Sequence, residues 1–97
     1  MPAYVIVEAD VLDEEVGLEY WRLAEPSIRR FGGRYLVATV PEAVEGAWPA
    51  DRRAVVLEFP DLERIREWYD SPEYSAARAV RKSGVEVRMI FADGVRG

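Results

Sequence analysis

The residues best suited to chemistry are polar side chains between Phe59 and Arg81. They are Trp68, Tyr69, Ser71, Tyr74 and Arg78. Indole N–H and phenol O–H groups can hold the polar atoms of a ligand while the rings cover its apolar surface. The pattern predicts polar groups at the edge of an apolar pocket. Aromatics at helical spacing more often pack in a core, so the same residues also fit a core whose polar atoms bind backbone groups.

A second set of polar residues is expected at the ends of secondary-structure elements around the same apolar layer. It consists of Arg34, Tyr35, Glu45, Trp48 and Arg81. Glu45 would act as general acid or base, the tyrosines as hydrogen-bond donors, and an arginine as the contact for an anionic group. The alternative for Glu45 is a loop carboxylate that caps N–H groups or pairs with an arginine, which is the more common case. Both sets together predict one small-molecule pocket between a sheet and its helices.

Two short helices must position the first set. Pro60 cannot donate to a sheet and ends the preceding strand, and Asp61 follows as a helix N-cap. Ser71-Pro72 interrupts the helix because the residue before a proline disfavours the α region. The same pair suits a new helix, with serine as N-cap and proline at the first position. We therefore predict two helices that meet at Ser71-Pro72.

Alternating apolar residues predict four strands in the remainder of the chain. These are Ala3–Asp10, Arg34–Val40, Arg53–Phe59 and Glu86–Ala92. In the second strand the alternation places Tyr35, Val37 and Thr39 on one face and Leu36, Ala38 and Val40 on the other.

A long helix is predicted between the first two strands, with Asp13 as its N-cap. Pro26 is expected to kink this helix, and Gly32-Gly33 to end it with one glycine in a left-handed conformation. The connection from Pro41 to Asp51 is long for a turn, and long loops in small domains are often functional.

The predicted order of elements is β-α-β-β-α-β, which defines an α+β fold of the ferredoxin-like kind. The 97 residues form one domain, 1–97. Its antiparallel four-stranded sheet would carry helices on one face only. Ile6, Val56 and Ile90 would then lie on the uncovered face, so we expect a homodimer formed by sheet-to-sheet packing.

The amino-acid composition argues against several classes of function. The chain has no histidine and no cysteine, which removes the usual proton-transfer residue, the commonest zinc ligand and any thiol nucleophile. We expect no metal site and no cofactor. The net charge of −5 argues against nucleic acid as a partner. No apolar run is long enough for a membrane span, so we expect no membrane association and a cytoplasmic location.

Several motifs together resemble the DUF1330 family. They are GGRYLV at 32–37, EGAW at 45–48, LEFP at 57–60, and WYDSPEY at 68–74 with Arg81 after it. The resemblance runs from Ala3 to about Gly94 and implies a dimeric α/β barrel within the ferredoxin-like superfamily. That superfamily includes cofactor-free monooxygenases, isomerases and haem enzymes, but the family itself has no established activity to transfer. The chain departs from the family pattern at Ala38-Thr39-Val40-Pro41.

Four functions fit these observations. The first is the binding or transformation of a small organic molecule in the pocket. The second is a non-enzymatic dimeric interaction module, which predicts a filled interior without a cavity. The third is a tautomerase that uses Pro2 as an N-terminal amine after loss of Met1, and the fourth is a haem protein with tyrosine ligation.

Overall fold

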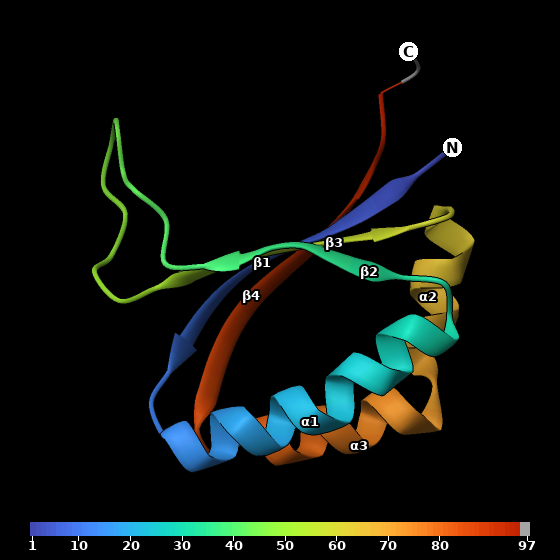
Figure 1. Ribbon diagram of the computed structural model, residues 1–97, viewed down its shortest axis with the longest axis horizontal. Helices are drawn as coiled ribbons and strands as arrows, with labels where there is room; N and C mark the ends of the chain where they lie inside the picture. The colour runs from blue at the N-terminus through green and yellow to red at the C-terminus, as the bar shows by residue number, and fades with distance from the viewer. Residues whose placement is uncertain (96–97) are drawn as a thin grey trace.

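Four antiparallel strands form one sheet in the order β2-β3-β1-β4, and three helices lie on one face of it (Figure 1). The computed structural model describes residues 1–95. The strands are β1 (Ala3–Val11), β2 (Arg34–Thr39), β3 (Arg53–Phe59) and β4 (Val85–Asp93). The helices are α1 (Glu14–Arg30), α2 (Leu62–Asp70) and α3 (Pro72–Arg81). This confirms the predicted α+β, ferredoxin-like arrangement.

The helices begin at the capping residues that the sequence predicts. Asp13 accepts hydrogen bonds from the N–H groups of Glu15 and Val16, and Asp61 accepts one from Arg64. Ser71 caps two helices. Its hydroxyl donates to the backbone oxygen of Trp68, near the end of α2, at 2.7 Å. The same oxygen also accepts from the N–H of Tyr74 at 3.2 Å. Ser71 therefore ends α2 and starts α3, as predicted.

The end of α1 depends on two glycines with different roles. Gly32 has a φ of +83°, so it is the left-handed residue predicted after this helix. Gly33 is buried, and a Cβ there would lie 2.6 Å from the ring of Phe59. Gly33 thus allows the start of β2 to approach β3 closely. The kink expected at Pro26, inside α1, stays a prediction.

The pairing of β2 with β3 corrects the predicted alternation in β2. Tyr35 pairs with Leu57 but Val37 pairs with Val56, so Leu36 is an extra residue in a bulge. The bulge shifts the alternation by one residue, and Ala38 then joins Tyr35 on the helix-covered face. The predicted set of Tyr35, Val37 and Thr39 on one face is therefore wrong after Tyr35.

The interior is filled at one end only. Large side chains from β3 and all three helices pack there without solvent exposure; they include Phe59, Ile65, Trp68, Tyr74 and Ile28. Toward the other end, where α1 begins, the sheet and the helix carry smaller residues such as Ala9 and Gly17. The fold therefore has a packed end and an open end beneath the same helix.

The face of the sheet without helices carries one apolar row across all four strands. Val37, Val56, Ile6 and Ile90 are aligned neighbours in that order. Ile90 is 60% exposed and Ile6 41%. We call these four residues the outer row. The loop between β2 and β3 rises on this same side of the sheet (Figure 1).

Within residues 1–95, no helix is both long enough and apolar enough to cross a membrane.

Candidate functional site

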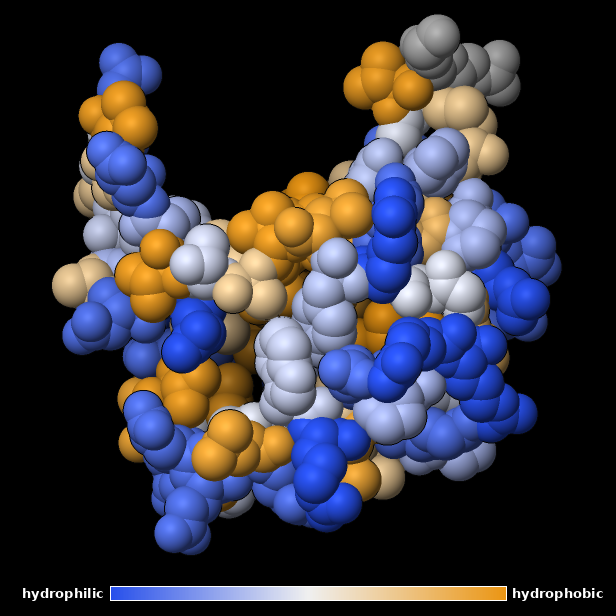
Figure 2. Space-filling model, viewed as in Figure 1, coloured by the Kyte–Doolittle hydropathy of each residue, from blue (hydrophilic) through white to orange (hydrophobic). Residues whose placement is uncertain are grey.

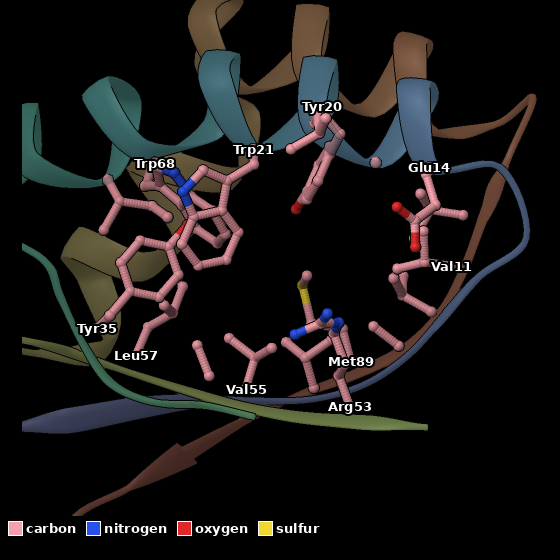
Figure 3. A pocket seen from close by; sticks show the side chains of 18 residues that line it. Val11, Glu14, Tyr20, Trp21, Tyr35, Arg53, Val55, Leu57, Trp68 and Met89 are labelled. Carbon is pink, nitrogen blue, oxygen red and sulfur yellow. The ribbon is translucent and has the colours of Figure 1, made fainter. Parts of the chain in front are cut away.

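A cavity of about 450 Å³ lies between α1 and the sheet, at the open end of the fold (Figure 3). Its walls are mostly apolar. They are formed by Val7, Ala9, Val11, Gly17, Leu18, Ile28, Ala38, Val55, Leu57, Val85, Val87 and Met89, with aromatic rings from Tyr20, Trp21, Tyr35 and Trp68 and charged side chains from Glu14 and Arg53. Four aromatic rings in such a wall suit a flat, apolar ligand.

Tyrosine hydroxyls provide the polar groups inside the cavity. The hydroxyl of Tyr20 points from α1 into the open space (Figure 3), and it lies 2.7 Å from the hydroxyl of Tyr74 on α3. Burial raises the pKa of Tyr20, and the neighbouring Tyr74 raises it further. Burial also raises the pKa of Tyr74, although Tyr20 and Arg81 act in the opposite direction. Both phenols are therefore protonated at neutral pH and act as hydrogen-bond donors rather than as bases.

Tyr35 adds a third hydroxyl near this pair. Its ring stacks on Trp21 with centroids 4.5 Å apart and planes at 19°. Burial raises the pKa of Tyr35, and the charges of Glu25 and Tyr74 contribute less. Tyr35 is thus a neutral donor held in place by an aromatic stack.

Trp68 contributes its ring to the cavity but not its polar atom. Its indole N–H donates to the hydroxyl of Ser27 at 3.0 Å, and that hydroxyl donates to the backbone oxygen of Ala24 at 2.6 Å. The indole N–H of Trp68 and the hydroxyl of Ser27 therefore both have partners within the protein. The N–H of Trp68 is thus used inside the protein, by a side-chain hydroxyl and not by the backbone group expected from the sequence.

Charged groups of opposite sign border the cavity. Glu14 lies in the first turn of α1, and Arg53 begins β3 on the helix-covered face. Both side chains belong to exposed residues, and Figure 3 shows them at the edge of the open space. They can contact a ligand that reaches the solvent, whereas the inner walls cannot supply a charge.

The structure brings some of the predicted site residues to this cavity. Tyr35 and Trp68 line the cavity. Tyr74 does not line it, but its hydroxyl is hydrogen-bonded to that of Tyr20, which does. Arg81 lies close enough to Tyr74 to lower the pKa of that hydroxyl.

Other predicted residues form a second hollow of about 310 Å³ on the helices. It is lined by Tyr69, Ser75, Arg78, Ala79, Arg81 and Lys82. The guanidinium of Arg78 lies over the ring of Tyr69, 4.2 Å from its centroid. Arg81, Tyr69 and Arg78 all line this second hollow, and none of them lines the cavity beneath α1.

The remaining predicted residues lie elsewhere. Arg34 is on the open face of the sheet and pairs with Glu58 at 2.8 Å. Ser71 is a cap, as described above. Glu45 and Trp48 lie in the exposed loop between β2 and β3, where the indole N–H of Trp48 donates to Arg52 O at 3.3 Å. The structure therefore does not place Glu45 with the tyrosines, and the single pocket predicted from the sequence is not formed by these residues. Pro2 is also exposed and outside the cavity walls.

Sequence reasoning missed Tyr20, Trp21, Glu14 and Arg53 as residues of the cavity. The alternation of β3 carried a signal, because Arg53 shares a face with Val55 and Leu57. Helical spacing can place Tyr20 on the inner face of α1, but it does not distinguish a packed ring from one in a cavity wall. Nothing in the sequence indicated that this part of the interior is hollow.

No group of three or more histidine, cysteine, aspartate or glutamate side chains that could hold a metal ion lies within residues 1–95.

The sheet order and the helices on one face define a ferredoxin-like α+β domain. The chain belongs to the family described as "Domain of unknown function (DUF1330)", which it matches over residues 2–95, as the motifs indicated. The comparison with curated proteins found no match.

Two solved structures illustrate the similarity of the fold. The RPA0582 protein of unknown function from Rhodopseudomonas palustris has a TM-score of 0.81 and 17% identity, covering 99% of this chain and 84% of that chain. SnoaB, a cofactor-independent oxygenase from Streptomyces nogalater, has a TM-score of 0.71 and 7% identity, covering 99% and 95%. At such low identities these similarities show the fold alone.

Proposed function

We propose that this protein binds a small, mostly apolar organic molecule in the cavity between α1 and the sheet. The observation that carries the proposal is the cavity itself, about 450 Å³ with four aromatic rings in its wall. Ligand pockets of about 300–1,000 Å³ with apolar walls and few polar groups are typical of small-molecule sites. The hollow counts against the pure interaction module, which predicts a filled interior.

Binding is better supported than acid–base catalysis. The three hydroxyls nearest the cavity belong to tyrosines whose pKa values are raised by burial, so none can accept a proton at neutral pH. Glu14 is the one carboxylate in the wall, and it is exposed at the border. The activity of SnoaB does not carry over to this chain, because the similarity concerns the fold.

We also propose that two copies pair through the open faces of their sheets. The outer row supports this proposal, since an apolar strip across four strands is exposed in the single chain. Polar groups border the strip on both sides, with Arg34 and Glu58 on one side and Glu8 with Arg88 on the other. Figure 2 shows an apolar surface between the loop and the C-terminal segment.

The cytoplasmic location expected from the sequence stays a prediction.

Titration with 2-isopropenylnaphthalene, followed by NMR of the indole N–H groups, tests the binding proposal. Trp21 and Trp68 line the cavity, whereas Trp48 lies in the distant loop and is an internal control. We expect the signals of Trp21 and Trp68 to shift with saturation while the Trp48 signal stays in place. Equal shifts of all three signals, or none, would contradict the proposal.

A cavity-filling variant makes this test specific. Ala38 lies on the helix-covered face of β2 and lines the cavity, so Ala38→Phe should occupy part of its volume. We expect it to weaken probe binding at least ten-fold. Ala43→Phe, in the exposed loop, is the matched control and should bind like the unmodified protein.

A further inference from the structure

We propose that the hydroxyl of Tyr20 donates a hydrogen bond into the cavity, so that the site selects apolar molecules that carry an acceptor oxygen such as a ketone. This proposal rests on the proposed function, because it names the class of ligand for the same cavity. It assigns to Tyr20 a role in specificity.

The hydroxyls of Tyr20 and Tyr74 share two protons between them. Tyr20 and Tyr74 have their hydroxyl oxygens 2.7 Å apart, and each phenol has one proton. The hydrogen bond between them uses one proton and leaves the other free. If Tyr74 donates to Tyr20, the free proton belongs to Tyr20, whose oxygen faces the cavity (Figure 3). If the direction is reversed, Tyr20 can only accept from a ligand.

The burial of Tyr74 sets the direction of this bond. Tyr74 is fully buried, and Tyr20 is the only partner recorded for its hydroxyl within residues 1–95. Arg81 follows Tyr74 by seven residues on α3, so both side chains leave the helix from nearly the same face. A guanidinium can only donate, and it stabilises negative charge on a nearby oxygen. The charge of Arg81 lowers the pKa of Tyr74 more directly than that of Tyr20. Because the proton of the Tyr74 hydroxyl has no other recorded acceptor among the described residues, it goes to the oxygen of Tyr20, and the charge of Arg81 strengthens this donation.

The Nε of Arg81 is buried and has no hydrogen-bond partner within residues 1–95. The charge of Arg81 acts on Tyr74 and Tyr74 is bonded to Tyr20, so the pair of hydroxyls is polarised toward the cavity. The last proton of this pair needs an acceptor, because an unsatisfied hydroxyl in an apolar enclosure is unfavourable. A ligand oxygen meets that need and a hydrocarbon does not.

The other polar groups of the cavity do not replace this donor. The indole N–H of Trp68 is used by Ser27, and Glu14 and Arg53 lie at the exposed border. Tyr35 lies near enough to raise the pKa of Tyr20, and its hydroxyl is a second neutral donor in the cavity wall. Neutral donors suit a carbonyl oxygen, which has two lone pairs.

Two isosteric probes test the proposal. 2-Acetylnaphthalene and 2-isopropenylnaphthalene differ only in C=O against C=CH₂, and indole NMR gives the Kd of each. We expect the unmodified protein to bind the ketone about ten-fold more tightly, which is the typical value of one hydrogen bond. The Tyr20→Phe variant should no longer prefer the ketone, while it should bind the hydrocarbon at least as well as the unmodified protein does.

Arg81→Gln tests whether the charge of Arg81 strengthens this donor, with Arg78→Gln on the same helix as the control. We expect the ketone preference to fall several-fold in Arg81→Gln and to be unchanged in Arg78→Gln. Equal Kd values for the two probes in the unmodified protein would overturn this proposal but leave the proposed function intact. If neither probe binds, the proposed function fails as well. The comparison of probes needs no variant, so it remains decisive even if Tyr20→Phe does not fold.

Discussion

At the scale of single residues, the buried polar atoms divide into two kinds. Those of Trp68 and Ser27 are fully used within the protein and fix the position of the packed end. The hydroxyls of Tyr20 and Tyr35 lie beside empty space instead. Because an interior polar group is stable only with a partner, the first kind stabilises the fold and the second is suited to a ligand.

Ser27 supplies the only partner recorded for the indole N–H of Trp68 within the described residues. Ser27→Ala leaves this N–H buried and unsatisfied, which costs about 1–3 kcal/mol of unfolding free energy. Urea unfolding followed by fluorescence measures the loss. Ser83→Ala removes a similar serine bond at an exposed position and should cost less than about 0.5 kcal/mol. Equal effects of the two variants would contradict the assigned role of Ser27.

Glu8 gives the protein a pH-dependent contribution to stability. The hydrogen bond from Arg88 lowers the pKa of this carboxyl, and the charges of Arg88 and Arg52 lower it further. The contribution is therefore present above the ordinary value of about 4.5 and is lost as the pH falls through the lowered pKa. Glu8→Gln should lower Tm at pH 7, and the difference from the unmodified protein should shrink below pH 4. A difference that is constant from pH 7 to pH 3 would show that the carboxylate charge is not involved.

At the scale of elements, the features that could be predicted are those set by residues close together in the sequence. Asp61 and Ser71 specify helix starts within a few residues, so the corner between α2 and α3 follows directly from the sequence. The bulge at Leu36 depends on pairing with a strand seventeen or more residues away, and no local signal marks it. The cavity likewise depends on how α1 lies over the sheet. Its ring residues could be recognised as inward-facing, but the space between them could not.

The turn from α1 into β2 depends on the absence of a side chain at Gly33. A Cβ there would lie 2.6 Å from the ring of Phe59 and 2.9 Å from Ile28. Gly33→Ala should therefore destabilise the protein by about 1–3 kcal/mol, as expected for overpacking. Chemical denaturation measures this cost. In a Phe59→Leu background, where the clashing ring is absent, the same substitution should cost clearly less. Additive effects of the two changes would argue against the clash.

At the scale of the whole molecule, the sheet separates two apolar regions with different environments. One side holds the cavity beneath the helices, and the other carries the outer row in the open. The loop with Glu45 and Trp48 rises beside the open side (Figure 1). In the proposed dimer this loop would flank the partner chain, which gives these residues a place at the interface instead of the ligand site.

Ile90→Glu tests the proposed dimer at the end of the outer row on β4, an edge strand of the sheet. Ile90 is 60% exposed in the single chain, so a carboxylate there should leave the fold intact, but facing a second sheet it would be buried without a partner. Analytical ultracentrifugation should give twice the 11.0 kDa chain mass for the unmodified protein and a single chain for Ile90→Glu. Leu12→Glu, at a 63% exposed position between β1 and α1, is the matched control and should remain dimeric. Since the cavity lies on the opposite side of the sheet, Ile90→Glu should still bind the naphthyl ketone. An unmodified protein that sediments as a single chain at micromolar concentration would exclude pairing through the outer row, and it would leave the ligand site unaffected.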